Sequence, residues 1–277
     1  MEVLGIFRDY LNLKKVKLAA TFADEQRAVD NALSLFDQAG LISRIGEDEE
    51  EADDVEEVVY SLEDEKRLNI EYYKNNILHY FLPASFLAIA ILSKREDMIL
   101  LKDIMEDYVF LKRLFRYEFI YDDSKDDADE IRELMSYFRE RGMIFLEDRE
   151  GDAWIVVRGI GRNNLVPFEG LVHNYIESYW VAVRGCSYLR KGTLSEKDFM
   201  RKLRGLGEKL FQKGEIRRAE ALSQSNYANA LRFLQLADIL VVEEVMEKGA
   251  KRAIKFYSLT DDRSKLEGLR RKLFNFM

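Results

Sequence analysis

Apolar and polar positions along the chain predict the same local order three times: an amphipathic helix that ends near a small residue, then a β-hairpin. In the first copy, apolar residues recur at helical spacing over Asp24–Gln38. Gly40 follows where a helix stop belongs. Leu41–Ile45 and Val58–Leu62 then have the composition of two short strands. The pattern therefore predicts a small helix-plus-hairpin unit near the start of the chain.

Two further units repeat this order. Their predicted helix and strands are Asp129–Arg141, Ile144–Leu146 and Ala153–Val157 in the second copy, and Asn226–Leu236, Ile239–Val242 and Ala253–Leu259 in the third. A helix followed by a twisted hairpin is the core of a winged helix. The three copies share no sequence period, so the pattern does not indicate a solenoid.

Longer helices are predicted between these units. They are Lys66–Leu92, Leu100–Phe119, Phe168–Leu189, Glu196–Lys213 and Ser264–Phe274. Two prolines, 47% hydrophobic residues and 34% charged residues in 277 positions also favour a helix-rich globular chain. We therefore predict a mainly α fold with small β-hairpins (α+β), a helical bundle with about three winged-helix-like units and no large sheet. The chain is expected to be one domain, 1–277, with sub-units of about 1–93, 94–160 and 161–277.

Several features favour a cytoplasmic protein. Met1–Leu18 lacks the basic start, apolar run and cleavage site of a signal peptide. The longest apolar stretch, Ile77–Leu92, falls short of the roughly 20 residues that a membrane span needs, so we expect a buried core helix. The single cysteine, Cys186, lies in an apolar stretch and is predicted to be a buried structural thiol.

Two acidic segments interrupt the helical pattern. Glu47–Glu57 has nine carboxylates in eleven positions, and Asp122–Glu130 has six. Carboxylates at this density repel one another and favour an extended, solvated loop. A divalent-cation site is the alternative, but the Asp-x-Asp-x-Asp-Gly spacing of a calcium loop is missing. We therefore expect solvated loops and no metal site.

The charge balance argues against a nucleic-acid partner. The net charge is -8, whereas phosphate binding needs a basic surface. The first predicted helix, Asp24–Gln38, has four carboxylates against one arginine, which is the opposite of what a recognition helix needs.

No constellation of residues in the sequence predicts catalysis. The two histidines, His79 and His173, lack an orienting carboxylate except for Glu177, one helical turn after His173, and such a lone pair is usually structural. Phosphate-loop and nucleophile-elbow motifs are missing, and we expect no helix to open directly after Gly159–Arg162, as a dinucleotide fingerprint would require. We predict no catalytic residue, no cofactor and no metal ligand.

Three segments carry a family resemblance. Glu71–Pro83 contains Tyr-Tyr-Lys-Asn-Asn-x-x-His-x-Phe, and Phe110–Tyr121 and then Phe168–Leu171 with Ile176–Tyr179 follow in order. In these segments, and over about 24–242, the chain resembles the region downstream of the catalytic domain in membrane-associated glycerol-3-phosphate acyltransferases. The resemblance implies a role in glycerophospholipid biosynthesis.

The catalytic signatures of that family are missing. Asn-His-x-x-x-x-Asp, whose histidine is the family's general base, does not occur, and Pro167–Gly170 has the wrong order for the phosphate-holding Phe-Pro-Glu-Gly. The resemblance therefore implies an accessory domain, either part of a longer enzyme or a separate subunit, that packs against and supports an acyltransferase catalytic domain. An independent winged-helix regulator or scaffold is the alternative.

The first of these segments contains a candidate interaction stripe. Tyr72, Asn75, Asn76 and His79 are three and four residues apart, so they share one face of a helix that is otherwise apolar. Buried without partners, such groups would each cost roughly 1–3 kcal/mol. Either the stripe is internal and bonds the backbone ends of the neighbouring hairpin, or it is a face that meets the catalytic domain.

Basic residues gather in the second half of the chain. Arg190–Arg218 has ten Lys and Arg against four Asp and Glu, and Lys248–Lys272 has nine against three. Ordinary solvated helix faces would account for this. Alternatively, these segments meet anionic lipid, where each basic residue contributes about 1 kcal/mol. The second interpretation predicts peripheral contact with the inner membrane.

Overall fold

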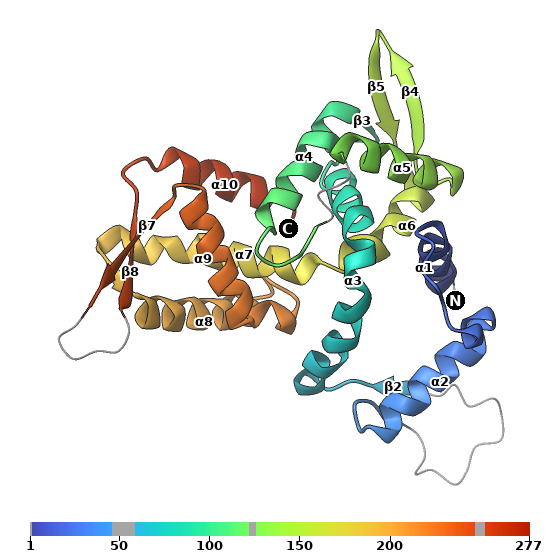
Figure 1. Ribbon diagram of the computed structural model, residues 1–277, viewed down its shortest axis with the longest axis horizontal. Helices are drawn as coiled ribbons and strands as arrows, with labels where there is room; N and C mark the ends of the chain where they lie inside the picture. Colours follow the sequence, from blue (N-terminus) through green and yellow to red (C-terminus); the bar gives the residue numbers. More distant parts are fainter. Residues whose placement is uncertain (1, 46–58, 122–125, 247–252) are drawn as a thin grey trace. The chain divides into compact units, whose positions relative to one another are not determined.

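The computed structural model describes residues 2–45, 59–121, 126–246 and 253–277, and its chain divides into two compact units, Met1–Tyr80 and Phe81–Met277 (Figure 1). Within the described residues the fold is mainly helical with three small antiparallel sheets, which confirms the predicted fold class. The helix-plus-hairpin order is also confirmed. The winged-helix geometry stays a prediction.

The first unit holds the first predicted helix and hairpin. Its elements are α1 (Glu2–Leu13), a short 3₁₀ turn (Ala20–Ala23), α2 (Glu25–Gln38), β1 (Ser43–Ile45), β2 (Val59–Ser61) and the first part of α3 (Asp64–Leu92). Helix α1 was not predicted. Strands β1 and β2 pair antiparallel, and the acidic segment Glu47–Glu57 between them lies outside the described residues.

Helix α2 has the ends that its sequence indicates. The Asp24 side chain accepts a hydrogen bond from the Arg27 amide at 3.1 Å, which satisfies one of the unpaired donors of the first turn. Gly40 has φ +66°, and the Leu41 amide donates back to the Phe36 carbonyl at 2.8 Å. A left-handed glycine with this returning bond is a common helix stop.

The second unit begins with the end of α3 and a three-stranded sheet. Its next elements are β3 (Met98–Leu100), α4 (Leu101–Leu114), α5 (Asp127–Glu140), β4 (Phe145–Arg149) and β5 (Asp152–Val156). The predicted hairpin β4–β5 is present, and β3 adds a third strand that pairs with β5. This added strand was not predicted.

Two boundaries in this region were predicted wrongly. Helix α4 ends at Leu114 instead of Phe119, because Phe115 leaves helical geometry and its ring packs on Tyr175 and Tyr179. Helix α5 begins at Asp127, so the last part of the acidic segment is a first helical turn, where carboxylates favour the positive end of the helix dipole. Residues 122–125 lie outside the described residues.

The rest of the second unit surrounds α7. The elements are α6 (Gly159–Gly170), α7 (His173–Gly185), 3₁₀ turns at Cys186–Lys191 and Ala219–Leu222, β6 (Leu194–Ser195), α8 (Glu196–Gln212), α9 (Gln224–Leu236), β7 (Leu240–Val245), β8 (Ile254–Leu259) and α10 (Ser264–Phe274). Helices α8, α9 and α10 contact α7, and Figure 1 shows α8 and α9 beside it. The predicted hairpin β7–β8 is confirmed, with β6 as an unpredicted third strand.

The predicted helix Phe168–Leu189 is two helices, because the backbone changes direction at Leu171 and Val172. The expectation of no helix at Gly159–Arg162 was also wrong: α6 starts there. Gly161 is buried, and a Cβ at this position would collide with the carbonyl of Met143. Gly161 therefore marks a close approach of α6 to the backbone at Met143.

Helix α7 is the core of the second unit, with twelve of its residues buried. Aromatic rings from the segment after α4, from α9 and from α10 pack against it, including Phe115 against Tyr179 at 5.0 Å and Phe119 against Tyr175 at 4.9 Å between ring centroids. Cys186 follows α7 and is fully buried, and burial raises the pKa of its thiol to about 12. The prediction that this thiol is buried is confirmed.

Helix α3 changes character along its length. From Phe81 to Leu92 almost every residue is buried, whereas most side chains from Tyr72 to Tyr80 are exposed. Among the described residues one segment, Asn69–Leu92, is long and apolar enough to cross a membrane by length and composition, so the prediction that this region is too short was wrong. Because 61% of that window is buried, α3 also matches the predicted core helix.

Candidate functional site

The predicted interaction stripe lies on the first half of α3. Tyr72 is 67% exposed, and Asn75, Asn76 and His79 are exposed as well. The internal alternative requires burial of these side chains, so their exposure favours the alternative of an interaction face. Asn75 makes a polar contact, so solvent is not its only partner. The stripe combines amide, imidazole and phenol groups on one helix face.

Apolar side chains flank the stripe on the same helical turns. Tyr73, Ile77 and Tyr80 are 53%, 49% and 37% exposed. The rings of His79 and Tyr80 lie 3.9 Å apart between centroids. Mixed aromatic, aliphatic and amide surface of this kind is typical of protein interfaces, where tyrosine is enriched. The arrangement suits recognition of a protein surface.

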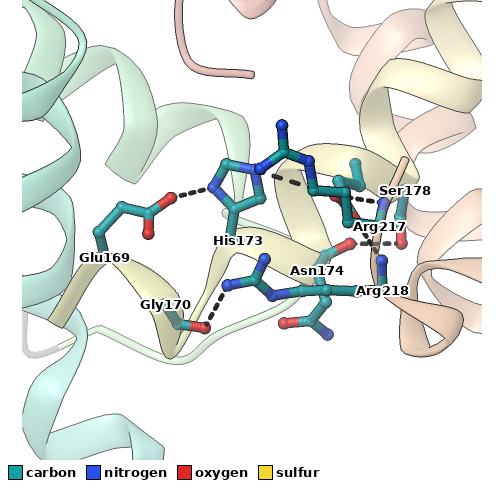
Figure 2. A network of polar contacts seen from close by, with 8 residues as sticks. Glu169, Gly170, His173, Asn174, Ser178, Arg217 and Arg218 are labelled. Carbon is teal, nitrogen blue, oxygen red and sulfur yellow. Dashed lines mark hydrogen bonds and ion pairs between the residues drawn. The ribbon is translucent and has the colours of Figure 1, made fainter. Parts of the chain in front are cut away.

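A second polar group, around His173, is buried in the second unit (Figure 2). His173 Nδ1 contacts Glu169 Oε1, and Nε2 lies 4.0 Å from Glu177 Oε1. Glu169 lies in the last turn of α6, four residues before His173. Glu177 lies in α7, four residues after His173. The predicted His173–Glu177 proximity is therefore present, and Glu169 is an additional partner.

Glu177 is occupied by backbone donors. Its two oxygens accept hydrogen bonds from the amides of Arg217 and Arg218 at 2.9 and 3.0 Å. The Arg218 guanidinium also donates to the Gly170 carbonyl at 3.5 Å, at the end of α6 (Figure 2). Consecutive amides around a carboxylate form an anion-binding nest. This carboxylate therefore joins α7 to the chain that leads into α9.

Ser178 forms the next link. Its hydroxyl contacts the Asn174 carbonyl and the Ala221 carbonyl, both at 2.9 Å, and receives a hydrogen bond from Asn226 Nδ2 at 3.1 Å. Ser178, Asn174 and Asn226 are all buried. Buried polar groups that are satisfied in this way fix how helices pack. We call this set of contacts the α7 network. Its members are Glu169, Gly170, His173, Asn174, Glu177, Ser178, Arg217, Arg218, Ala221 and Asn226.

A further carboxyl group, Glu118, meets the other side of α7. Asn229 Nδ2 donates to Glu118 Oε2 at 2.9 Å. Burial raises the pKa of Glu118 to about 7, against the lowering effect of hydrogen bonds from Asn229 and Tyr179. Burial and the nearby Glu118 carboxyl raise the pKa of Tyr121 and Tyr179 as well. This cluster contains a carboxyl group that titrates near neutral pH.

These groups have partners within the fold. His173 contacts two carboxylates, and Ser178 is committed to backbone carbonyls and Asn226. Among the described residues, no three His, Cys, Asp or Glu side chains are placed to hold a metal ion.

Sequence reasoning missed the partners of these groups. Glu118 and Tyr179 lie in the second and third segments that carry the family resemblance, which was the one available signal. Arg218, Asn226 and Asn229 lie far along the chain, and nothing in their local pattern indicates the contacts they make. Only folding brings the later residues to α7.

A comparison with known protein families places these features in context. Residues 1–243 match the family model of the glycerol-3-phosphate acyltransferase C-terminal region. The match includes α3 with its exposed stripe and α7 with its network. No curated protein matches the chain.

Proposed function

Because the chain belongs to the family of glycerol-3-phosphate acyltransferase C-terminal regions, we propose that it is the accessory part of such an enzyme. It packs against a separate acyltransferase catalytic domain, in the same longer chain or as another subunit, and supports it without catalysing the transfer. One observation carries this proposal: the exposed α3 stripe lies within a chain that has the family's C-terminal region and lacks the family's catalytic sequence motifs.

The stripe is the proposed contact with the catalytic domain. The stripe offers hydrogen-bond donors and acceptors from Tyr72, Asn75, Asn76 and His79. The flanking apolar side chains offer surface from which water is released on binding. Interfaces of this composition depend on a few central residues, with tyrosine prominent among them. Tyr72 and His79 are therefore expected to contribute most to the contact.

The direct experiment measures association between the full chain and an acyltransferase domain of the family, and the domain's activity with and without the chain. We expect binding, higher activity of the domain, and no transfer by the chain alone. The variant His79→Ala, combined with Tyr72→Ala, should weaken binding about tenfold or more, which is the usual effect of removing central interface residues. Asn163→Ala, at another exposed helical position, is the control and should bind normally.

Two results would reject the proposal. One is acyl transfer by the purified chain that a substitution of its own residues abolishes. The other is association that the stripe variants leave unchanged while the domain is fully active alone.

We also propose peripheral contact with an anionic membrane through the basic segments. On α8, the side chains of Lys197, Lys202, Arg204 and Lys209 are exposed. Each basic residue near an anionic surface contributes about 1 kcal/mol, and salt screens the attraction. Co-sedimentation should therefore be stronger with anionic than with neutral vesicles and should fall with salt. Equal binding to both vesicles would reject the membrane contact.

A further inference from the structure

An apolar pocket lies between α4, α9 and α10, apart from the stripe and the α7 network. Its volume is about 390 Å³, which is in the range of small-molecule sites. Phe110, Phe233, Leu236 and Leu269 supply apolar walls. Phe110 opens the second segment of the family resemblance, and neither the proposed function nor the buried networks use it here.

Cationic groups line the same pocket. Arg113 is exposed, and its guanidinium makes no ion pair or side-chain hydrogen bond within the part of the chain that the structure describes. Lys265 lies 3.2 Å from Asp238, the one carboxylate of the lining. Arg113 is therefore a charge without a counter-ion beside an apolar wall.

A third cation, Lys272, is only partly neutralised. Its ammonium group lies 2.9 Å from Asp107 and 4.6 Å from the centre of the Phe110 ring. The same Asp107 lies 2.7 Å from Lys94, so one carboxylate faces two ammonium groups. Together with Arg113, this leaves an excess of positive charge at the edge of the apolar walls.

We propose that this pocket binds a single-chain amphiphile with an anionic head. The alkyl chain lies against Phe110, Phe233 and Leu269, and the head meets Arg113 and Lys272. A guanidinium recognises phosphate or carboxylate oxygens in a bidentate way, which suits Arg113 to this role. Free phosphate would leave the apolar walls in water, and a neutral alkyl chain would leave the cations without a partner.

Gly268 gives a specific test. It lines the pocket, and a Cβ added there meets no heavy atom within 4 Å. Gly268→Leu therefore adds side-chain volume at the pocket wall from a Cβ position that is free, and it also favours the helix. Gly205→Leu is the matched control, because Gly205 is an exposed helical glycine of α8 with the same free space and lies outside the pocket.

The experiment is calorimetric titration of the full chain with dodecyl phosphate below its micelle concentration. We expect one saturable site, an affinity at least about tenfold lower in Gly268→Leu, and an unchanged affinity in Gly205→Leu. Arg113→Gln should lower the affinity about fivefold for dodecyl phosphate and leave weak binding of dodecyl maltoside unchanged. Inorganic phosphate at the same concentration should not compete.

Three outcomes would overturn the site. They are the absence of saturable binding, equal loss in both glycine variants, and competition by inorganic phosphate as strong as that of the amphiphile. Circular dichroism and the melting temperature of each variant establish that it is folded, so that a loss of binding reports on the pocket.

Discussion

The first half of α3 and the whole of α7 use similar side chains in opposite ways. Both place Tyr, Asn and His among apolar residues, and both contain part of a segment with the family resemblance. On α3 the stripe is exposed, whereas on α7 His173, Asn174 and Ser178 are buried. The difference comes from later parts of the chain, because residues 217–226 supply the partners of α7. Polar residues on an apolar helix therefore indicate a contact, but not whether it is internal.

The largest effect on stability is expected from a substitution in the α7 network. Glu177→Ala removes the acceptor of the Arg217 and Arg218 amides. Two donors lose their partner, at roughly 1–3 kcal/mol each where they stay buried. We expect the free energy of unfolding to fall by about 2–6 kcal/mol in urea denaturation. Glu208→Ala, an exposed carboxylate of α8, is the control, and equal losses in the two variants would contradict the role of Glu177.

The next prediction concerns the pH dependence of stability at Glu118, a second and partly buried polar group beside α7. The pKa of Glu118 is raised from 4.5 to about 7 in the folded chain. Between pH 4.5 and about 7 the folded state binds more protons than the unfolded state. The free energy of unfolding therefore falls as the pH rises through this range, and the loss is complete above pH 7. The cost is up to about 3 kcal/mol.

Glu118→Gln keeps an acceptor for Asn229 but cannot ionise. Relative to the original chain, the variant should therefore gain stability as the pH rises from 5 to 8. The measurement is urea denaturation of both proteins at several pH values. A constant difference across this range would show that Glu118 is not a buried titrating group.

A smaller effect is expected at Ser178, whose hydroxyl joins α7 to Ala221 and Asn226. Ser178→Ala leaves the buried Asn226 amide without this acceptor and should cost about 1–3 kcal/mol. Ser178→Ala in the Asn226→Ala background should cost less than in the original chain, because the two groups share one contact. A strictly additive double variant would contradict the coupling.

The smallest effect concerns stability on the α3 side. Asn76 and His79 are exposed, so Asn76→Ala and His79→Ala should each change the free energy of unfolding by less than about 0.5 kcal/mol. Thermal unfolding of the isolated chain measures this change. A large loss of stability in either variant would place the stripe with α7 as an internal contact and remove the contrast.

Much of the local structure could be predicted from the sequence. The capped α2, the buried second half of α3, the three hairpins and α10 (Ser264–Phe274) have patterns whose period and end signals agree. The errors occur where tertiary contacts override the pattern: Phe115 turns away to reach Tyr175 and Tyr179, and the chain bends between α6 and α7. The short strands β3 and β6 were missed because they are strands only through their pairing with β5 and β8, and this pairing does not show in the local sequence pattern.

The sequence alone determined the fold class, the family and the residues of the α3 stripe, because these depend on composition, periodicity and motifs that neighbouring positions carry. Only the tertiary structure decided which polar residues are buried and which are exposed. A hydrogen bond between Asn226 and Ser178, or a carboxylate between Lys94 and Lys272, joins positions far apart in the chain. Burial and charge balance depend on all groups that folding brings together, and one segment does not contain that information.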